Sequence, residues 1–204
     1  MRNLFLPLTA IVVAAILGGA AYMALKPQEA HLSPAMMNIG GAEIGGPFEL
    51  TKHDGTRITS AELIDGPTLL YFGYTFCPDI CPVDTLNMAD ATELLASKGI
   101  QLRPVFITVD PERDTAEALG YFVEGLHPRM VGLTGSPEEI DAAADAFKVF
   151  YQRVNIPDSA AGYLMNHTGY MYLMTPEKGL TALFRNGASA EQLAADIEIL
   201  LGEI

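Results

Sequence analysis

The chain begins with one long apolar run. Residues 4–25, LFLPLTAIVVAAILGGAAYMAL, carry no charged side chain over 22 positions. As a helix this run would extend roughly 33 Å at about 1.5 Å per residue, and the hydrocarbon core of a bilayer is roughly 30 Å thick. We therefore expect residues 1–25 to form a single transmembrane helix that anchors the chain. A signal peptide cleaved near Ala20 is the alternative, although its apolar core is usually shorter, roughly 7 to 15 residues.

The next stretch, residues 26–42, has no apolar periodicity and contains two prolines and a pair of glycines. Such a composition is typical of a linker. Its His31, Met36 and Met37 are ligand types that suit copper. We expect no metal site among them, because a flexible tether has nothing to fix their geometry.

Residues 43–204 alternate between strand-like and helix-like patterns. Residues 47–59 alternate apolar and polar positions around Asp54-Gly55, which predicts a β-hairpin. His53 is expected to lie exposed beside its turn. Residues 67–74, PTLLYFGY, are continuously apolar, as in a strand buried on both faces.

Later elements follow from apolar periodicity and from helix caps. Asp114, Ser136 and Ser189 each begin a stretch with capping-box form. The pattern predicts strands at residues 100–110, at 129–135 and twice within 167–184, and helices at 82–99, from 114, at 136–150 and at 189–201. Strands that alternate with helices indicate an α/β fold with parallel crossovers, and the closing pair of strands adds an antiparallel hairpin.

Charge narrows the possible partners. The formal net charge of the 204-residue chain is −13. Residues 1–26 hold Arg2 and Lys26 and no acid, so the remainder has 10 basic and 25 acidic residues, or −15. A nucleic-acid partner is excluded, because there is no basic stripe to follow a phosphate backbone. A soluble acidic surface, or docking onto a basic partner, fits this balance.

The charges that flank the apolar run indicate where the chain is located. Arg2 precedes the run, and the positive-inside rule places this short end in the cytoplasm. The N-terminus lacks the Arg-rich and Ser-rich character of a mitochondrial presequence. We therefore expect a single-pass protein of a bacterial inner membrane with its folded domain in the periplasm. In that oxidising compartment, two neighbouring cysteines form a disulfide, are kept reduced by a dedicated donor, or bind a metal.

Both cysteines of the chain lie in YTFCPDICP, residues 74–82, and each is followed by proline. A structural disulfide between Cys77 and Cys81 would close a very short loop and so stabilise the fold little. The pattern instead predicts a strand, a tight turn and a helix with the thiols at the helix N-terminus. Unsatisfied amides and the helix dipole favour thiolates there, the form that attacks disulfides and binds metals.

Four motifs identify a family. YFGYTFCPDICP, VFITVDPERDT, HPRMVGLTGS and NHTGYMYLMTPEKG resemble, in order and spacing, the Sco/SenC family of membrane-anchored, thioredoxin-like copper chaperones for cytochrome c oxidase. The resemblance covers residues 43–204 and the anchor. It implies a thioredoxin-like fold with an extra N-terminal β-hairpin, and a copper site made of Cys77, Cys81 and His167. It also implies that Asp79 tunes that site from outside the ligand set.

One local departure from the family pattern follows the second cysteine, where Val83 and Asp84 are expected to alter the rim that a partner meets. Other polar residues have structural interpretations. His127 precedes a proline in a predicted loop, Asp110 ends a predicted strand and Asp114 caps a predicted helix, so we expect all three to serve the fold.

The ligand types fit copper on chemical grounds as well. Thiolates select Cu(I), and imidazole accepts both Cu(I) and Cu(II). A structural zinc site would need a fourth ligand, and the chain has no third cysteine.

The first functional hypothesis is a chaperone that delivers copper, as Cu(I) or Cu(II), to the binuclear copper A site of cytochrome c oxidase subunit II. It would be served by a periplasmic copper donor and a thiol reductant. The second is a thiol-disulfide reductase of the same target that cycles through a Cys77–Cys81 disulfide. A peroxiredoxin-like peroxidase, suggested by Thr75 ahead of Cys77, is a third. A copper or redox sensor would use the same residues.

Overall fold

A computed structural model of the chain describes residues 17, 32–37, 43–78, 80–157 and 161–202. The residues divide into two compact units, Met1–His31 and Leu32–Ile204. Leu17, the described residue of the first unit, is helical. No helix within the described residues is long and apolar enough to cross a membrane. The other residues of the predicted helix at 1–25 lie outside the described ones, so the transmembrane helix remains a prediction.

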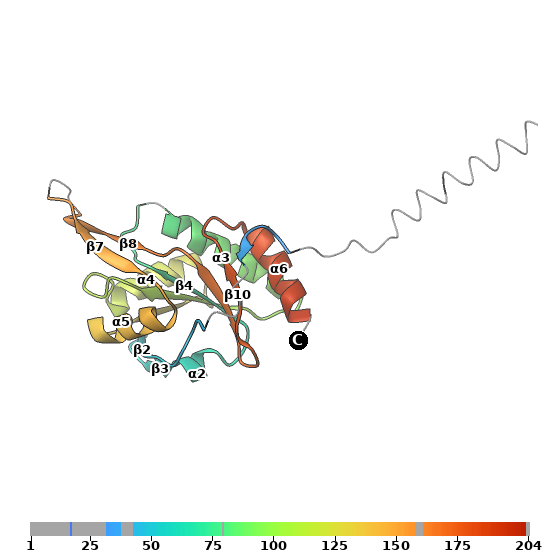
Figure 1. Cartoon of the computed structure of the whole chain (residues 1–204), viewed down its shortest axis with the longest axis horizontal. Coiled ribbons are helices and arrows are strands. Elements are labelled where there is room, and N and C mark those ends of the chain that lie inside the picture. The colour runs from blue at the N-terminus through green and yellow to red at the C-terminus, as the bar shows by residue number, and fades with distance from the viewer. Residues whose placement is uncertain (1–16, 18–31, 38–42, 79, 158–160, 203–204) are drawn as a thin grey trace, which may run out of the picture. The chain divides into compact units, whose positions relative to one another are not determined.

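The second unit is built on a mixed sheet of eight strands in the order β1-β10-β9-β4-β5-β6-β2-β3, shown in Figure 1. The strands are β1 Met36–Met37, β2 Glu49–Lys52, β3 Arg57–Thr59, β4 Thr68–Gly73, β5 Arg103–Thr108, β6 Val131–Thr134, β9 Met171–Thr175 and β10 Gly179–Phe184. The helices are α2 Ser60–Leu63, α3 Ile80–Ala96, α4 Ala116–Leu126, α5 Pro137–Ala146 and α6 Ala190–Gly202. A separate two-stranded ribbon pairs β7 Tyr151–Asn155 with β8 Tyr163–His167.

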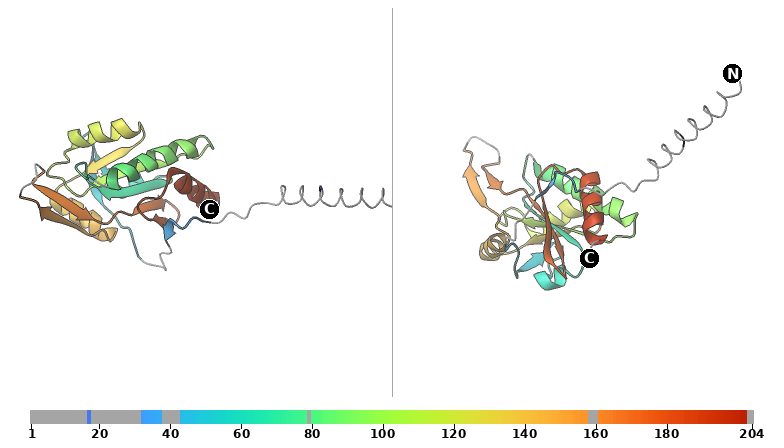
Figure 2. Two further views of the ribbon diagram at one scale, coloured as in Figure 1. Left: turned by 90° about the horizontal axis from the view of Figure 1, so that it is seen from above. Right: turned by 45° about the vertical axis from the view of Figure 1, so that its right-hand side comes forward.

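Strand directions confirm the α/β class. β4, β5 and β6 run parallel and are connected by α3 and α4, whereas β9 and β10 form the predicted antiparallel hairpin at the other side of β4. The predicted N-terminal hairpin is β2–β3, which joins the sheet through β6. Helices α3, α4 and α6 cover one face of the sheet and α5 covers the other (Figure 2).

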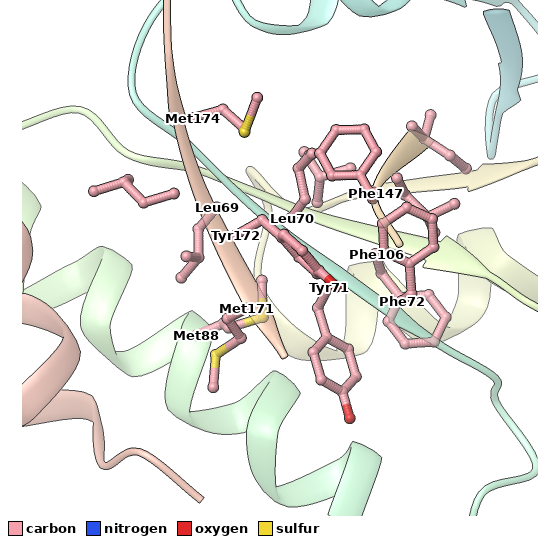
Figure 3. Close-up of a cluster of buried hydrophobic side chains, with 14 of the residues drawn as sticks. Leu69, Leu70, Tyr71, Phe72, Met88, Phe106, Phe147, Met171, Tyr172 and Met174 are labelled. Carbon is pink, nitrogen blue, oxygen red and sulfur yellow. The ribbon is translucent and has the colours of Figure 1, made fainter. Parts of the chain in front are cut away.

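The central strand β4 is buried at all six positions, as its continuous apolar sequence predicts. Aromatic rings fill the side of the sheet under α5. The ring of Phe147 lies 5.5 Å from that of Phe72 and 5.4 Å from that of Tyr172, centroid to centroid. Figure 3 shows this cluster. A strand held so firmly on both faces fixes the point at which the chain leaves the sheet for the cysteine turn.

Local capping chemistry was predicted correctly at two of three helices. Ser136 caps α5 in a full capping box with Glu139. Ser189 and Gln192 exchange backbone and side-chain hydrogen bonds at the start of α6 in the same way. The prediction for Asp114 was wrong, because Thr115 is the N-cap of α4. The Asp114 carboxylate is buried and accepts hydrogen bonds from other parts of the chain.

Two further expectations need correction. His53 is half-buried rather than exposed, because pairing of β2 with β6 brings its Nδ1 atom within 3.1 Å of the Gly132 N–H, which donates to it.

Part of the predicted linker belongs to the fold. Met36 and Met37 form β1 on the edge strand β10, and Ser33 donates two hydrogen bonds to the carboxylate of Asp196 on α6.

The β7–β8 ribbon was not predicted. In Figure 1 it projects at the left of the second unit, above α5. Four of the five residues of β7 are exposed, so its sequence YQRVN lacks the apolar alternation by which a half-buried strand is recognised. Its strand character comes from pairing with β8, which places Tyr151 opposite His167.

Candidate metal centre

The two cysteines lie where β4 passes into α3. Cys77 is half-buried in the turn, with its N–H donating to the Tyr74 carbonyl at 3.2 Å. Cys81 is in the first turn of α3 and is only 1% exposed. Both are present as thiols. The strand, turn and helix arrangement predicted from YTFCPDICP is therefore confirmed, while Asp79 lies outside the described residues.

Gly73, the last residue of β4, allows Cys81 to approach the strand. A Cβ atom at this position would lie 3.3 Å from the Cys81 sulfur, 2.9 Å from a ring carbon of Tyr71 and 3.0 Å from one of Phe106. Contacts below about 3.4 Å leave no room for a methyl group unless a neighbour shifts. A glycine is thus needed here for close approach, and the buried thiol rests directly on the backbone of the sheet.

His167 reaches the thiols from the end of β8. Its Nε2 atom lies 3.1 Å from the Cys81 sulfur, and its Nδ1 atom lies 3.1 Å from the carbonyl oxygen of Thr168. A carbonyl can only accept a hydrogen bond, so Nδ1 carries the proton in the neutral ring and the Nε2 lone pair faces the sulfur. The ligand atoms of Cys77, Cys81 and His167 all lie within 4.8 Å of one another.

Aromatic rings enclose the imidazole. Tyr71 and Tyr74 meet it edge to face, with ring centroids 6.2 Å and 5.8 Å away. Both tyrosines are buried. Such an apolar surround limits water at the site and restricts how far the ring can rotate.

The pKa of Cys81 is shifted in the direction opposite to the one expected from its position at a helix N-terminus. Its hydrogen bond with Cys77 and then its burial raise the pKa of the Cys81 thiol above the ordinary value. These effects outweigh the helix N-terminus, which was expected to favour a thiolate. A bound cation reverses this balance, because a thiol that coordinates a metal loses its proton. The site therefore favours either a protonated buried thiol or a metal-bound thiolate.

The cysteine turn is tied to the loop before α4 through a buried carboxylate. Asp114 accepts hydrogen bonds from the N–H and the hydroxyl of Thr75, at 3.0 and 2.5 Å, and from the hydroxyl of Thr108 at 2.7 Å. Burial raises the pKa of Asp114, while these hydrogen bonds act in the opposite direction. Asp114 thus serves the structure, as expected, although as an anchor for the turn instead of a helix cap.

Arg113 and Tyr163 also contribute to the site, and sequence reasoning did not single them out. The guanidinium of Arg113 lies 3.7 Å from the ring centroid of Tyr163 in β8 and forms an ion pair with Asp110. The Tyr163 hydroxyl donates to Asp110 at 2.8 Å. The sequence signal is the arginine within the PERD part of VFITVDPERDT, where the flanking carboxylates were the residues interpreted.

Other candidate residues lie away from the thiols or face inward. His127 is buried, with its Nδ1 accepting from the Arg129 N–H at 3.0 Å and its Nε2 atom 2.6 Å from a Glu93 oxygen, which confirms a structural role. The expectation for Asp84 was wrong. Its carboxylate is buried and accepts from the Gly187 N–H at 2.8 Å, so it does not form the rim, whereas Val83 is exposed.

The arrangement defines a class of protein before any comparison. Two thiols and a neutral imidazole converge at one end of a mixed α/β sheet, and this donor set suits a soft metal ion such as Cu(I). The same two thiols, adjacent and four positions apart, are equally the parts of a dithiol–disulfide couple.

Comparison with known proteins agrees with this class. The family model for SCO1/SenC matches residues 36–202. Protein SenC of Rhodobacter capsulatus is 40% identical over 196 residues, which cover 95% of this chain and 87% of that protein. The chain therefore belongs to the SCO1/SenC family, and the resemblance found in its motifs is confirmed.

Solved structures extend the comparison to the fold. The crystal structure of Arabidopsis thaliana ScoI with copper bound is 40% identical, with a TM-score of 0.75, and the match covers 79% of this chain and 99% of that one. A structure of BsSco, described as a member of the Sco family of cytochrome c oxidase assembly proteins with a disulfide switch, is 26% identical with a TM-score of 0.58. That match covers 78% of this chain and 93% of the other.

Proposed function

We propose that this chain is a copper chaperone that delivers copper to the binuclear copper A site of cytochrome c oxidase subunit II during oxidase assembly. The observation that carries the proposal is the convergence of Cys77, Cys81 and His167, whose ligand atoms lie within 4.8 Å of one another. Copper bound to the related Arabidopsis protein and the oxidase role of the family support it.

The residues suggest how copper is held and released. The Nδ1 hydrogen bond to Thr168 keeps the His167 Nε2 lone pair directed at the thiols, so the imidazole is ready to bind without rearrangement. Cys81 is buried and Cys77 is half-buried. An incoming thiolate of the target therefore meets copper from the Cys77 side, and ligand exchange proceeds there while Cys81 and His167 still hold the ion.

Location and domain roles belong to the same proposal. Residues 1–25 anchor the chain once in a bacterial inner membrane, a linker follows, and the thioredoxin-like domain acts in the periplasm, where a copper donor and a thiol reductant serve it. The contacts of Ser33 with α6 and of Met36 and Met37 with β10 support a linker that ends before Ser33.

The test is an anaerobic titration of the reduced full chain, kept in solution with detergent, with Cu(I) against a competing chelator. We expect one copper per chain, and a loss of affinity of about 10-fold or more in His167→Ala and in Cys77→Ser, since each removes a ligand. His127→Ala is the matched control, because this histidine is buried away from the thiols. Binding by His167→Ala equal to that of the unmodified chain would refute the proposed site.

A second function is favoured by the contact between the two thiols. Cys77, the more exposed thiol, would attack a disulfide of the target as a thiolate, and Cys81 would then resolve the mixed disulfide. Two electrons pass to the target, which leaves as a dithiol, and the chain keeps a Cys77–Cys81 disulfide. Reduction of a disulfide-bonded subunit II fragment by the copper-free chain, at an unchanged rate in His167→Ala, would establish this activity separately from copper binding.

A further inference from the structure

We propose that Arg113 is a positioning residue that holds the β8 strand, and with it His167, against the cysteine turn. The inference rests on the proposed role of His167 as a copper ligand. It concerns a residue outside the ligand set, and it explains how a histidine on a ribbon separate from the main sheet is kept within 3.1 Å of a thiol in α3.

The first group of contacts joins Arg113 to β8. Its Nη1 atom donates to the carbonyl oxygens of Tyr163, at 3.1 Å, and of Ala161, at 3.4 Å. Its guanidinium stacks on the Tyr163 ring at 3.7 Å from the centroid. Tyr163 begins β8 and His167 ends it. A short strand that is held at its first residue by one backbone hydrogen bond and a stacked ring, and just before that residue by a second backbone hydrogen bond, has little freedom at its last.

The second group of contacts joins Arg113 to the cysteine turn. The same guanidinium lies 4.9 Å from the ring centroid of Phe76 and 5.7 Å from that of Tyr74. Phe76 directly precedes Cys77 in the chain. One side chain therefore contacts both the turn that carries the thiols and the strand that carries the imidazole.

The Arg113 side chain is itself held in place. It is only 16% exposed and forms an ion pair with Asp110, whose side chain is 4% exposed. A buried guanidinium is tolerated only when it is paired and hydrogen-bonded. The planar guanidinium can pair with a carboxylate, donate to two carbonyl oxygens and stack on an aromatic face at the same time, which a lysine ammonium cannot do. The contacts thus depend on arginine and not merely on positive charge.

Arg153 offers a matched control within the same cluster. Its guanidinium lies 3.6 Å from the Tyr163 ring centroid, much as that of Arg113 does. However, Arg153 belongs to β7, the other strand of the ribbon, its side chain is 48% exposed, and its ion-pair partner is the exposed Glu112. An exposed ion pair of this kind contributes about 1 kcal/mol or less. Removing Arg153 leaves the contacts between the ribbon and the cysteine turn through Arg113 intact.

The experiment compares the full-length chain with Arg113→Gln, Arg113→Lys, Arg153→Gln, His167→Ala and the double variant Arg113→Gln/His167→Ala. The first readout is independent of copper and follows hydrogen exchange of the backbone amides of residues 163–168 in the reduced protein. We expect faster exchange there in Arg113→Gln, a smaller change in Arg113→Lys, and protection like that of the unmodified chain in Arg153→Gln.

The second readout is Cu(I) affinity by competition. We expect Arg113→Gln to bind about 10- to 100-fold more weakly, as for a residue that orients a ligand. The double variant should bind no more weakly than His167→Ala, because Arg113 acts through the histidine. Arg153→Gln should stay within about fivefold of the unmodified chain, the limit set by an exposed ion pair.

The outcomes separate the two proposals. Unchanged exchange and unchanged Cu(I) affinity in Arg113→Gln overturn the positioning role, and so does a double variant whose losses simply add. If Arg113→Gln does not fold, Arg113→Lys decides by the same two readouts. Binding by His167→Ala equal to that of the unmodified chain overturns the proposed copper site instead, while the exchange of residues 163–168 still tests Arg113.

Discussion

The sulfur of Cys81 and the Nε2 atom of His167 lie 3.1 Å apart, although 86 positions separate the two residues in the chain. The thiol belongs to the first turn of α3 and the imidazole to the last residue of β8. Because the two come from different elements, the site depends on everything that holds the ribbon, the cysteine turn and β4 together.

The close approach at Gly73 predicts a cost for any side chain there. Gly73→Ala places a methyl group 2.9 Å from the Tyr71 ring and 3.3 Å from the Cys81 sulfur. We expect a loss of about 1–3 kcal/mol in the free energy of unfolding, as for other overpacked cores, and weaker Cu(I) binding because the thiol is displaced. Urea unfolding and chelator competition measure the two effects.

Gly125 in α4 is the control for this substitution, because a Cβ atom there meets nothing within 4 Å. Gly125→Ala should leave Cu(I) affinity unchanged and should leave stability unchanged or raise it by up to about 1 kcal/mol. Equal effects of the two substitutions would show that Gly73 does not set the position of Cys81.

Removal of His127 and removal of His167 should affect different properties of the protein, stability in the first case and Cu(I) affinity in the second. His127→Ala leaves the Arg129 N–H without its acceptor and leaves a small cavity, so we expect a loss of about 1–3 kcal/mol in stability and unchanged Cu(I) affinity. His167→Ala should lower Cu(I) affinity with a smaller effect on stability. Thermal unfolding and Cu(I) competition on both variants test this, and a drop in Cu(I) affinity for His127→Ala would contradict it.

The two thiols should react with iodoacetamide at different rates. Cys81 is 1% exposed, and its hydrogen bond with Cys77 together with burial raises its pKa. Cys77 is half-buried. We expect Cys77 to be alkylated at least about tenfold faster in the reduced protein, because Cys81 is less exposed and its raised pKa leaves less of the reactive thiolate. Peptide mass spectrometry over a time course measures both rates, and modification of Cys81 first would reverse the assignment of Cys77 as the attacking thiol.

Asp114 should make stability depend on pH. Burial raises its folded-state pKa above the ordinary value of 3.8, so the folded chain holds this proton more tightly than the unfolded chain does. The stabilising contribution of the proton is fully present below pH 3.8 and is lost as pH rises through the folded-state pKa. The free energy of unfolding, measured relative to Asp114→Asn, should therefore fall as pH rises above 3.8 and through the folded-state pKa of Asp114.

Urea unfolding of the unmodified chain and of Asp114→Asn at several pH values tests the sign. Subtracting the free energy of unfolding of Asp114→Asn from that of the unmodified chain removes the contributions of surface carboxylates such as Asp65 and Glu138. The pKa values of these carboxylates are lowered, so their contribution to stability rises with pH instead of falling. A difference that rises with pH would show that the hydrogen bonds from Thr75 and Thr108 outweigh burial at this carboxylate.

Local patterns in the sequence determined most of the α/β framework. The continuous apolar run of β4, the capping boxes at Ser136 and Ser189 and the turn with both thiols at the start of α3 all rest on interactions between residues a few positions apart. Such interactions are encoded in adjacent residues, so they can be predicted without knowing what packs against them. The four motifs also determined the family.

The tertiary structure alone decided how the site is assembled. β7 is a strand only because it pairs with β8, and Asp114 is an anchor instead of a cap because Thr75 and Thr108 come within reach of its carboxylate. The role of Arg113 likewise follows from rings and carbonyls far from it in the chain. The physical reason is the same in each case. Folding brings the partner that satisfies a polar group or pairs with an exposed strand, and this partner cannot be predicted from the periodicity of the residues along the chain.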